Sequence, residues 1–156
     1  MEFRLLSKAF QNGGFIPDLY SNTRLGKNIS PPLHWENPPR ETRSFAILVE
    51  DLDAPLIGVI THWVLYNIPP EKRELPEGVP EGKFLPDGTV QGRNFFRRNA
   101  YMGPEPPFGT HRYRFRIFAL DTRVSLDPKM TRRRLLKEMD QHILAQAQLV
   151  GLYGRR

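Results

Sequence analysis

Acidic, imidazole and phenolic side chains gather in two short segments of this chain. Residues 50–55 read EDLDAP and are soon followed by THW at 61–63, while residues 103–115 read GPEPPFGTHRYRF. An aspartate next to a histidine fixes the imidazole tautomer or keeps the ring charged. Two imidazoles and a tyrosine hydroxyl then offer hydrogen bonds to a small anion such as phosphate or carboxylate, and free backbone N–H groups in 103–109 add to them. The two segments therefore predict a pocket for a small anionic ligand.

The residues that covalent catalysis would need are missing from these segments. The chain has no cysteine, and no serine stands beside a histidine, so an activated nucleophile is not indicated. Asp51, Asp53, His62 and His111 are enough in number to bind a metal, but their spacing matches no zinc motif. We therefore predict a non-enzymatic protein with no metal and no cofactor, and a metal-dependent hydrolase is the less favoured alternative.

Three apolar runs of strand length must position the polar residues. Residues 44–49 are almost wholly apolar, residues 61–68 are rich in β-branched and aromatic side chains, and residues 113–120 begin with strict alternation. Residues two apart in a strand share a face. The rows expected to face the core are Phe45, Ile47, Val49 and Asp51; His62, Val64, Tyr66 and Ile68; and His111, Tyr113, Phe115 and Ile117.

Asp51, His62 and His111 stand at the ends of these three rows. If the strands are neighbours, the three side chains converge at one end of a sheet. Each residue alone also has an ordinary structural role, because a histidine near a core usually makes a hydrogen bond and an aspartate in a turn accepts nearby backbone N–H groups. The combination of the three, more than any single member, predicts the pocket.

Frequent turn residues between short strands indicate an antiparallel β fold. Fifteen prolines and twelve glycines divide the 156 residues into short pieces without βαβ alternation, which favours a β-sandwich or barrel. Residues 131–150 differ, because apolar residues recur there every three or four positions. This spacing predicts an amphipathic helix with Thr131 as its N-cap and Gly151 as its stop. Arg132, Arg133 and Arg134 would oppose the helix dipole; a solvent-exposed face is the favoured explanation, and a binding role is the alternative.

Length and charge limit the setting in which the protein works. A chain of 156 residues corresponds to one domain. No apolar run approaches the ~20 residues that span a bilayer, and the first residues lack a signal-peptide pattern, so we expect a cytoplasmic protein. The net charge of +6 favours acidic partners. The basic residues are scattered and form no known nucleic-acid-binding module, so nucleic acid is not a predicted partner.

The motifs resemble the two signature regions of the phosphatidylethanolamine-binding proteins. DxDAP at 51–55 is followed by HW at 62–63, and PPxG at 106–109 is followed by HRYxF at 111–115. The bacterial and archaeal branch, often called Raf-kinase-inhibitor-like, fits best. Further similar stretches are FQNGGFIP at 10–17, SPPLHW at 30–35, NIPP at 67–70 and HILAQAQLVGLY at 142–153.

The resemblance implies a single domain over residues 1–156, folded as an antiparallel Greek-key β-sandwich with a C-terminal α-helix. It also implies a small pocket for phosphate or phospholipid head groups. Members of the family are generally non-enzymatic regulators, and some inhibit kinases or serine proteases through surface loops, so such a protein target is an alternative expectation; a homodimer is compatible with it. The rim of the pocket departs from the family pattern. Glu105 stands where prokaryotic members commonly have cysteine, residues 94–97 read NFFR where the family usually has NDFG, and Arg97 and Arg98 are expected to offset the charge of Glu105. The ligand-binding residues implied are Asp51, Asp53 (as a support of the loop), Pro55, His62, Pro107, His111 and Tyr113.

Overall fold

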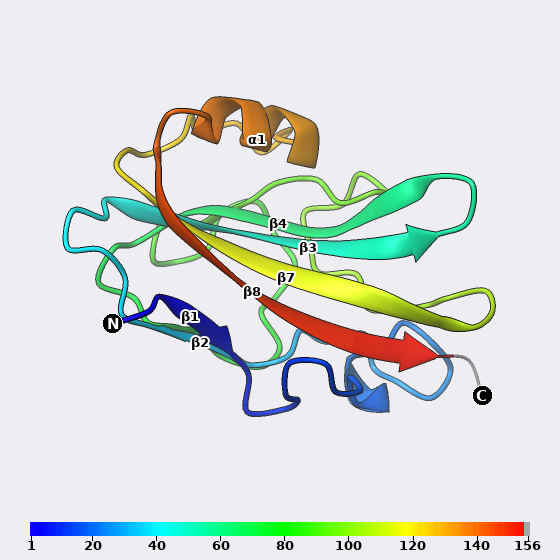
Figure 1. Ribbon diagram of the computed structural model, residues 1–156. Helices are drawn as coiled ribbons and strands as arrows, with labels where there is room; N and C mark the ends of the chain where they lie inside the picture. Colours follow the sequence, from blue (N-terminus) through cyan, green and yellow to red (C-terminus); the bar gives the residue numbers. More distant parts are fainter. Residues whose placement is uncertain (155–156) are drawn as a thin grey trace.

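The computed structural model describes residues 1–154 and arranges them in two antiparallel sheets and one α-helix (Figure 1). The smaller sheet has the order β1 (Arg4–Leu6), β2 (Leu33–Glu36) and β5 (Glu74–Leu75). The larger sheet has the order β6 (Val90–Gln91), β4 (Gly58–Ile68), β3 (Ser44–Ala54), β7 (Thr110–Leu120) and β8 (Ile143–Gly154). A 3₁₀ turn, η1 (Asp18–Tyr20), and helix α1 (Arg132–Met139) lie outside the sheets. None of the helices in residues 1–154 is long and apolar enough to cross a membrane.

The strand connections follow the Greek-key pattern. Within the larger sheet, β3, β4 and β6 lie side by side in the order of the chain, which passes through β5 of the smaller sheet between β4 and β6. β7 then returns to the other side of β3, antiparallel to it. The spatial order β7-β3-β4-β6 is therefore that of a Greek key. β8 pairs with β7 along most of its length and forms an edge of the sheet. The predicted antiparallel Greek-key sandwich is thus confirmed.

β3 is apolar on both faces because it separates two core layers. Phe45, Ile47 and Val49 pack between the two sheets, whereas Ala46 and Leu48 pack under α1. All five side chains are at most 2% exposed. Full burial of one large aliphatic side chain contributes about 1.5–3 kcal/mol, so a strand in this position favours apolar residues at every place. The continuous apolar run predicted this double burial correctly.

The predicted C-terminal helix is present but much shorter than expected. Thr131 is its N-cap, with Oγ1 accepting the backbone N–H of Arg134 at 3.3 Å, yet α1 ends at Met139. Leu135 and Met139 are buried against the large sheet. Gln141 then adopts a left-handed conformation with φ 72°, which ends the helical direction. The prediction of a helix as far as Val150 is therefore wrong.

Strand β8 occupies the second half of the predicted helix. Ala145, Ala147 and Leu149 alternate with glutamines and face the core between the sheets. Alanine, glutamine and leucine favour helices in isolation, but pairing with β7 supplies backbone hydrogen bonds and buries this face. Gly151 is not a helix stop. A Cβ atom on it would lie 2.5 Å from Cγ1 of Ile16, so close packing explains the glycine.

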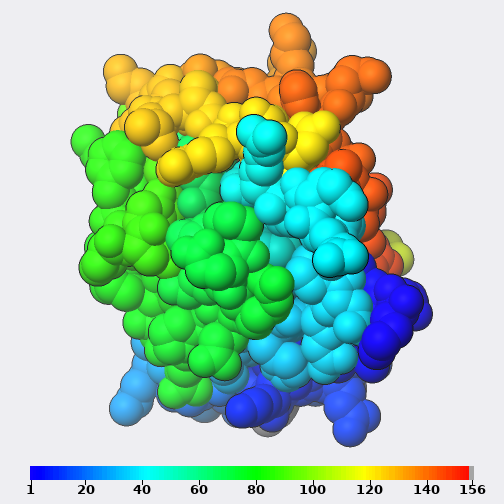
Figure 2. Space-filling view, turned by 90° about the vertical axis from the view of Figure 1, so that its left-hand side faces the viewer, coloured from blue at the N-terminus to red at the C-terminus, as the bar shows by residue number. Residues whose placement is uncertain are grey.

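The predicted site residues lie at one end of the larger sheet. β3 ends there and β4 and β7 begin there, at the right of Figure 1. The opposite end faces the viewer in Figure 2, where the segments between β2 and β3 (cyan) and between β4 and β6 (green) cover it. The pocket therefore forms at the end of the sandwich where loops connect to the end of β3 and to the starts of β4 and β7.

Candidate functional site

A β-bulge in β4 brings His62 into the pocket. Val49 pairs with Trp63 and Glu50 pairs with Thr61, so His62 is an extra residue with no partner of its own in β3. Its ring packs edge-on against Tyr113, with centroids 5.3 Å apart. Val64 and Tyr66, by contrast, pack under α1. The prediction that His62 shares a core-facing row with Val64 and Tyr66 is therefore wrong, although the predicted convergence with Asp51 and His111 is present.

Asp51 fixes the ring of His111. Nδ1 of His111 donates to Oδ2 of Asp51 at 2.8 Å, and both side chains are buried. The other carboxylate oxygen, Oδ1, accepts the backbone N–H of Asp53 at 2.8 Å. The carboxylate accepts both bonds, so the proton of a neutral His111 resides on Nδ1, and Nε2 remains for a ligand.

His62 is held by a backbone carbonyl rather than by a carboxylate. Its Nδ1 donates to the carbonyl oxygen of Met102 at 2.6 Å. Burial lowers the pKa of His62 below its ordinary 6.5, although the Met102 carbonyl and the charge of Asp51 act in the opposite direction. His62 is therefore neutral at pH 7, and its Nε2 atom is a hydrogen-bond acceptor.

Tyr113 forms the floor behind the two imidazoles. Its ring lies roughly parallel to that of His111, with centroids 6.4 Å apart, and it is 1% exposed. Burial, followed by the charge of Asp51, raises the pKa of the Tyr113 hydroxyl far above 10. Despite its closeness to Asp51, the hydroxyl has no well-formed hydrogen bond within residues 1–154. Tyr113 thus positions the histidine rings and does not line the cavity itself.

The cavity in front of these residues has a volume of about 310 Å³. Five of the seven predicted site residues line it, and Asp53 and Tyr113 do not. Asp53 is turned towards Arg112, whose backbone N–H, Nε and Nη2 groups all donate to its carboxylate at 2.8–3.0 Å. These bonds lower the pKa of Asp53, and they support the loop as expected. The lining residues are Asp51, Ala54, Pro55, Ile57, Ile60, His62, Phe95, Phe96, Met102, Gly103, Glu105, Pro107 and His111.

Much of the cavity wall was not identified from the sequence. Ile57 and Ile60 come from the β3–β4 hairpin, and Phe95 and Phe96 come from the loop after β6. Phe95 and Phe96 form an edge-on pair, 5.3 Å between centroids, and remain partly exposed at the mouth. The resemblance placed residues 94–101 at the rim of the pocket, but it did not predict that Phe95 and Phe96 line the cavity. The pocket therefore has an apolar mouth and a polar floor.

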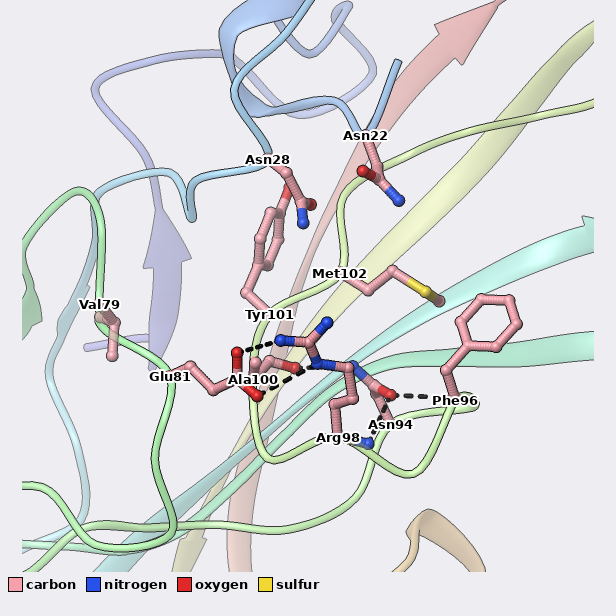
Figure 3. Close-up of a pocket in the computed structure, with 10 residues that line it drawn as sticks. All are labelled: Asn22, Asn28, Val79, Glu81, Asn94, Phe96, Arg98, Ala100, Tyr101 and Met102. Atoms are coloured by element: carbon pink, nitrogen blue, oxygen red, sulfur yellow. Dashed lines mark hydrogen bonds and ion pairs between the residues drawn. The ribbon is translucent and has the colours of Figure 1, made fainter. Parts of the chain in front are cut away.

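A second cavity of about 320 Å³ adjoins the first and shares Phe96 and Met102 with it (Figure 3). Asn94 determines the shape of the loop between the two cavities. Its Oδ1 accepts the backbone N–H groups of Phe96 and Arg98 at 3.0 and 3.1 Å, and its Nδ2 donates to the Ala100 carbonyl at 3.0 Å. Arg98 forms an ion pair with Glu81, so it does not offset the charge of Glu105 as expected. Glu105 instead accepts from Asn22 at 3.1 Å.

A buried ionic cluster lies under the other face of the same strand end. Glu50 is fully buried, and its carboxylate accepts from Nε of Arg114, Arg116 and Arg132 at 2.5–3.1 Å. Burial alone would raise the pKa of Glu50, but the three guanidinium groups outweigh it and the pKa is lowered. Arg112, Arg114 and Arg116 alternate with the core-facing row from His111 to Ile117, so the sequence predicts them on the opposite face, as observed. Glu50, the partner of Arg114 and Arg116, was not identified from the sequence. The position of Glu50 next to Asp51 was a signal for this pairing. Neighbouring residues in a strand face opposite sides, so Glu50 lies on the same face as the arginines.

Within residues 1–154, no group of three or more His, Cys, Asp or Glu side chains is arranged to hold a metal ion. His62 lies near Asp51 and His111, but its Nδ1 already binds a backbone carbonyl. The lining residues also include no serine, threonine, cysteine, lysine or tyrosine that could act as a nucleophile. The arrangement is therefore suited to hydrogen bonding with a bound group.

Comparison with known proteins identifies the family of this chain. A model of the phosphatidylethanolamine-binding proteins matches residues 6–154. The UPF0098 protein of Methanothermobacter thermautotrophicus is 48% identical over 151 residues, which cover 97% of this chain and 98% of that protein. The UPF0098 protein of Archaeoglobus fulgidus is 46% identical over 96% of this chain, which spans 50% of that protein's length.

Solved structures show the same architecture. A phosphatidylethanolamine-binding protein homologue from Chlamydia trachomatis has a TM-score of 0.89 at 38% identity, covering 99% of this chain and 98% of its own. YbcL of E. coli, described as a member of the mammalian family, has a TM-score of 0.91 at 30% identity over 100% of both chains. The match over nearly the whole chain, with nearly half of the residues identical to the methanogen protein, shows that this protein belongs to the phosphatidylethanolamine-binding protein family.

Proposed function

We propose that the protein is a non-enzymatic binding protein whose cavity at Asp51, His62 and His111 takes a small phosphate-bearing group, either free phosphate or a phospholipid head group. Family membership supports a binding or regulatory role. The observation that carries the proposal is the fixed orientation of the two imidazoles. Each Nδ1 atom is already bonded, to Asp51 or to Met102. The Nε2 atoms of both rings therefore remain to contact a ligand. In the neutral rings they are acceptors, so they take hydrogen bonds from the ammonium group of the ligand or from a protonated phosphate oxygen.

The charges around the cavity favour a ligand that is not purely anionic. Asp51 and Glu105 line it, and no lysine or arginine of residues 1–154 does. A phosphate dianion alone would be repelled by two carboxylates, and neutral His62 offers it no positive charge. A positively charged amine next to the phosphate would offset this repulsion. Phosphoethanolamine has this chemistry, and it agrees with the ligand in the family's name.

A titration followed by NMR tests this function. The imidazole resonances of His62 and His111 are recorded while phosphoethanolamine, inorganic phosphate or ethanolamine is added at constant ionic strength. We expect phosphoethanolamine to shift both histidines at the lowest concentration. His142 is the internal control, because it is exposed and pairs with Asp121 outside the pocket. Unchanged His62 and His111 resonances at millimolar concentrations of all three compounds would refute the proposed function.

Glu105→Gln separates the contributions of the two ligand charges. Removing this carboxylate is expected to weaken phosphoethanolamine binding and to strengthen the binding of inorganic phosphate, each by about two- to fivefold for an exposed ion pair. If both ligands bind equally well before and after the substitution, the amine does not contact this edge of the cavity.

A second candidate function is inhibition of a serine protease or kinase through the surface loops. Leu56, at the tip of the β3–β4 hairpin, is fully exposed and has φ 66°. A leucine in this conformation costs about 1–2 kcal/mol. Together with its neighbour Ile57, which is 57% exposed, Leu56 forms a contiguous apolar tip that favours contact with a partner protein. The test is an inhibition assay with the wild type, Leu56→Ser and His111→Ala. Inhibition lost in Leu56→Ser and retained in His111→Ala supports the loop function; no inhibition by the wild type contradicts it.

A further inference from the structure

Four arginines line a groove of about 610 Å³ that adjoins the pocket. We call it the arginine groove; it lies between the loop after β6, the start of β4 and the first turn of α1. Phe95 lines both this groove and the pocket, so it separates the two. The lining residues include no carboxylate: they are Val59, Thr61, Arg93, Asn94, Phe95, Arg97, Thr131, Arg132 and Arg133. The groove is thus basic, whereas the described part of the chain gives the pocket no basic side chain apart from its histidines.

Arg132 is fixed in a position that leaves part of its guanidinium free. Its Nε atom donates to Oε2 of Glu50 at 2.5 Å, and Glu50 is fully buried. Its Nη1 and Nη2 groups make no hydrogen bond with the residues that the structure describes. The side chain of Arg132 is 29% exposed, so these two groups can reach a ligand. A guanidinium that is held by a buried carboxylate loses little conformational entropy when it binds.

The other three arginines of the groove have no acidic partner within residues 1–154. Arg98, Arg112 and Arg134, which lie nearby in the chain, are each paired with a carboxylate. The unpaired ones nevertheless have fixed backbones. Arg93 donates its backbone N–H to the Met130 carbonyl at 2.7 Å, and Arg97 donates its own to the Asn94 carbonyl at 2.9 Å. The fold therefore brings several uncompensated positive charges together on two rigid segments.

We propose that the arginine groove is a second binding site, for a doubly charged phosphoryl group, distinct from the histidine pocket. Planar guanidinium groups bind phosphate oxygens through paired hydrogen bonds, and these charge-assisted bonds are among the strongest in proteins. Repulsion among the four arginines falls when a dianion lies between them. The site also accounts for the basic first turn of α1, since Arg132 anchors the site and Arg133 faces it. It does not depend on the function proposed for the pocket.

The experiment follows the ¹⁵Nε resonances of the arginine side chains during titration with inorganic phosphate and with pyrophosphate at constant ionic strength. A parallel titration uses phosphatidylcholine vesicles with and without phosphatidic acid, whose phosphomonoester can carry two negative charges, so that a free phosphate and a lipid phosphate are distinguished. We expect the Arg132 resonance to shift with either source, and the more effective source identifies the natural form of the ligand. If no arginine of the groove responds to any of these probes, the second site does not exist.

Variants separate this site from the pocket and from general charge. Arg133→Gln should weaken binding at the groove about three- to fivefold, as expected for one partly exposed ion pair. Arg24→Gln is the matched control, because Arg24 lies outside the groove and has no ion pair within residues 1–154. His111→Ala should leave the Arg132 response unchanged even if it abolishes binding in the pocket. Equal weakening by Arg133→Gln and Arg24→Gln would show that only the net charge matters, which overturns the proposal.

Discussion

Oδ2 of Asp51 lies 2.8 Å from Nδ1 of His111, while Oδ1 of the same carboxylate accepts the backbone N–H of Asp53. One buried carboxylate on β3 therefore fixes both the ring on β7 and the turn that leads into the hairpin. In the opposite orientation of the His111 ring, Nε2 would be bound to the carboxylate and would not be available to the ligand. The geometry assigns Asp51 a positioning role in the pocket.

Asp51→Asn should weaken the binding of phosphoethanolamine. Loss of a hydrogen bond to a charged group costs about 1.5–3 kcal/mol, so we expect the Kd to rise about tenfold or more. Calorimetric titration measures the change. The matched control is Asp121→Asn, because Asp121 forms the same contact with His142 at 2.8 Å on the surface. An unchanged Kd in Asp51→Asn would contradict the positioning role.

His62 makes the stability of the protein sensitive to acid. Burial lowers the pKa of His62 below 6.5 in the folded protein, so the unfolded chain takes up a proton at higher pH than the folded chain does. The free energy of unfolding therefore falls as the pH drops through 6.5 towards the folded pKa. Urea unfolding of His62→Gln should depend less on pH, between about pH 7 and about pH 5, than that of the wild type. Equal slopes, or an NMR titration of His62 at or above 6.5, would contradict this.

Glu50→Gln should destabilise the fold without removing any pocket residue. Removing one partner from a buried ion pair costs about 3–5 kcal/mol; because Arg114, Arg116 and Arg132 are partly exposed, we expect about 2–3 kcal/mol here. Chemical denaturation measures the loss. Glu41→Gln serves as the control, since Glu41 is exposed and has no ion pair within residues 1–154. Its stability should stay within about 0.5 kcal/mol of the wild type. A similarly small effect of Glu50→Gln would mean that the cluster contributes little.

Glu50, like His62, makes the free energy of unfolding fall as the pH drops. The cause differs, because acid removes from Glu50 the charge that pairs with the arginines, whereas it adds to His62 a charge that burial disfavours. The pKa of Glu50 is lowered in the folded state, so its stabilising contribution is complete above the unfolded value of 4.5. The contribution is lost as the pH falls from there through the folded pKa. Acid unfolding of Glu50→Gln should therefore lack the part of the transition that the wild type shows below about pH 4.5.

The sequence predicted well what depends on strand periodicity. The inward row from Tyr113 to Ile117, the outward arginines and the double burial of residues 44–49 follow from alternation, and all three are confirmed. The bulge at His62 could not be predicted, because the extra residue becomes visible only when the β3–β4 register is known. The convergence of His62 with Asp51 and His111 was thus predicted from simple alternation along β4, which the bulge interrupts.

Longer-range packing explains the other differences. The segment from Ile143 to Gly154 has residues that favour helices, but β7 offers a free edge that pairs with it. Its alternation of alanine and glutamine was a signal for a strand that the helical spacing concealed. The loop from Asn94 to Arg98 carries no periodic pattern, because side-chain hydrogen bonds of Asn94 determine its shape. The resemblance placed this loop at the rim of the pocket, but no pattern predicted that Phe95 and Phe96 form part of its wall.

Asn94→Ala should open this loop. Loss of three hydrogen bonds of a buried amide is expected to cost about 1–3 kcal/mol locally, and the amide protons of Phe96 and Arg98 should exchange faster with solvent. Asn94→Asp is the matched variant, since it retains the acceptor for both amides and loses only the donor to Ala100. Its amides should exchange at an intermediate rate. If the two variants exchange at the same rate as the wild type, Asn94 does not hold the wall of the pocket.

The most direct measurement is a crystal structure of the protein with phosphoethanolamine in the pocket. We expect density for the ligand within hydrogen-bonding distance of Nε2 of His62 and His111, with the amine on the side of Glu105. Asp51 should still hold His111 through Nδ1. An empty pocket at saturating ligand, or a ligand that contacts neither histidine, would contradict the account.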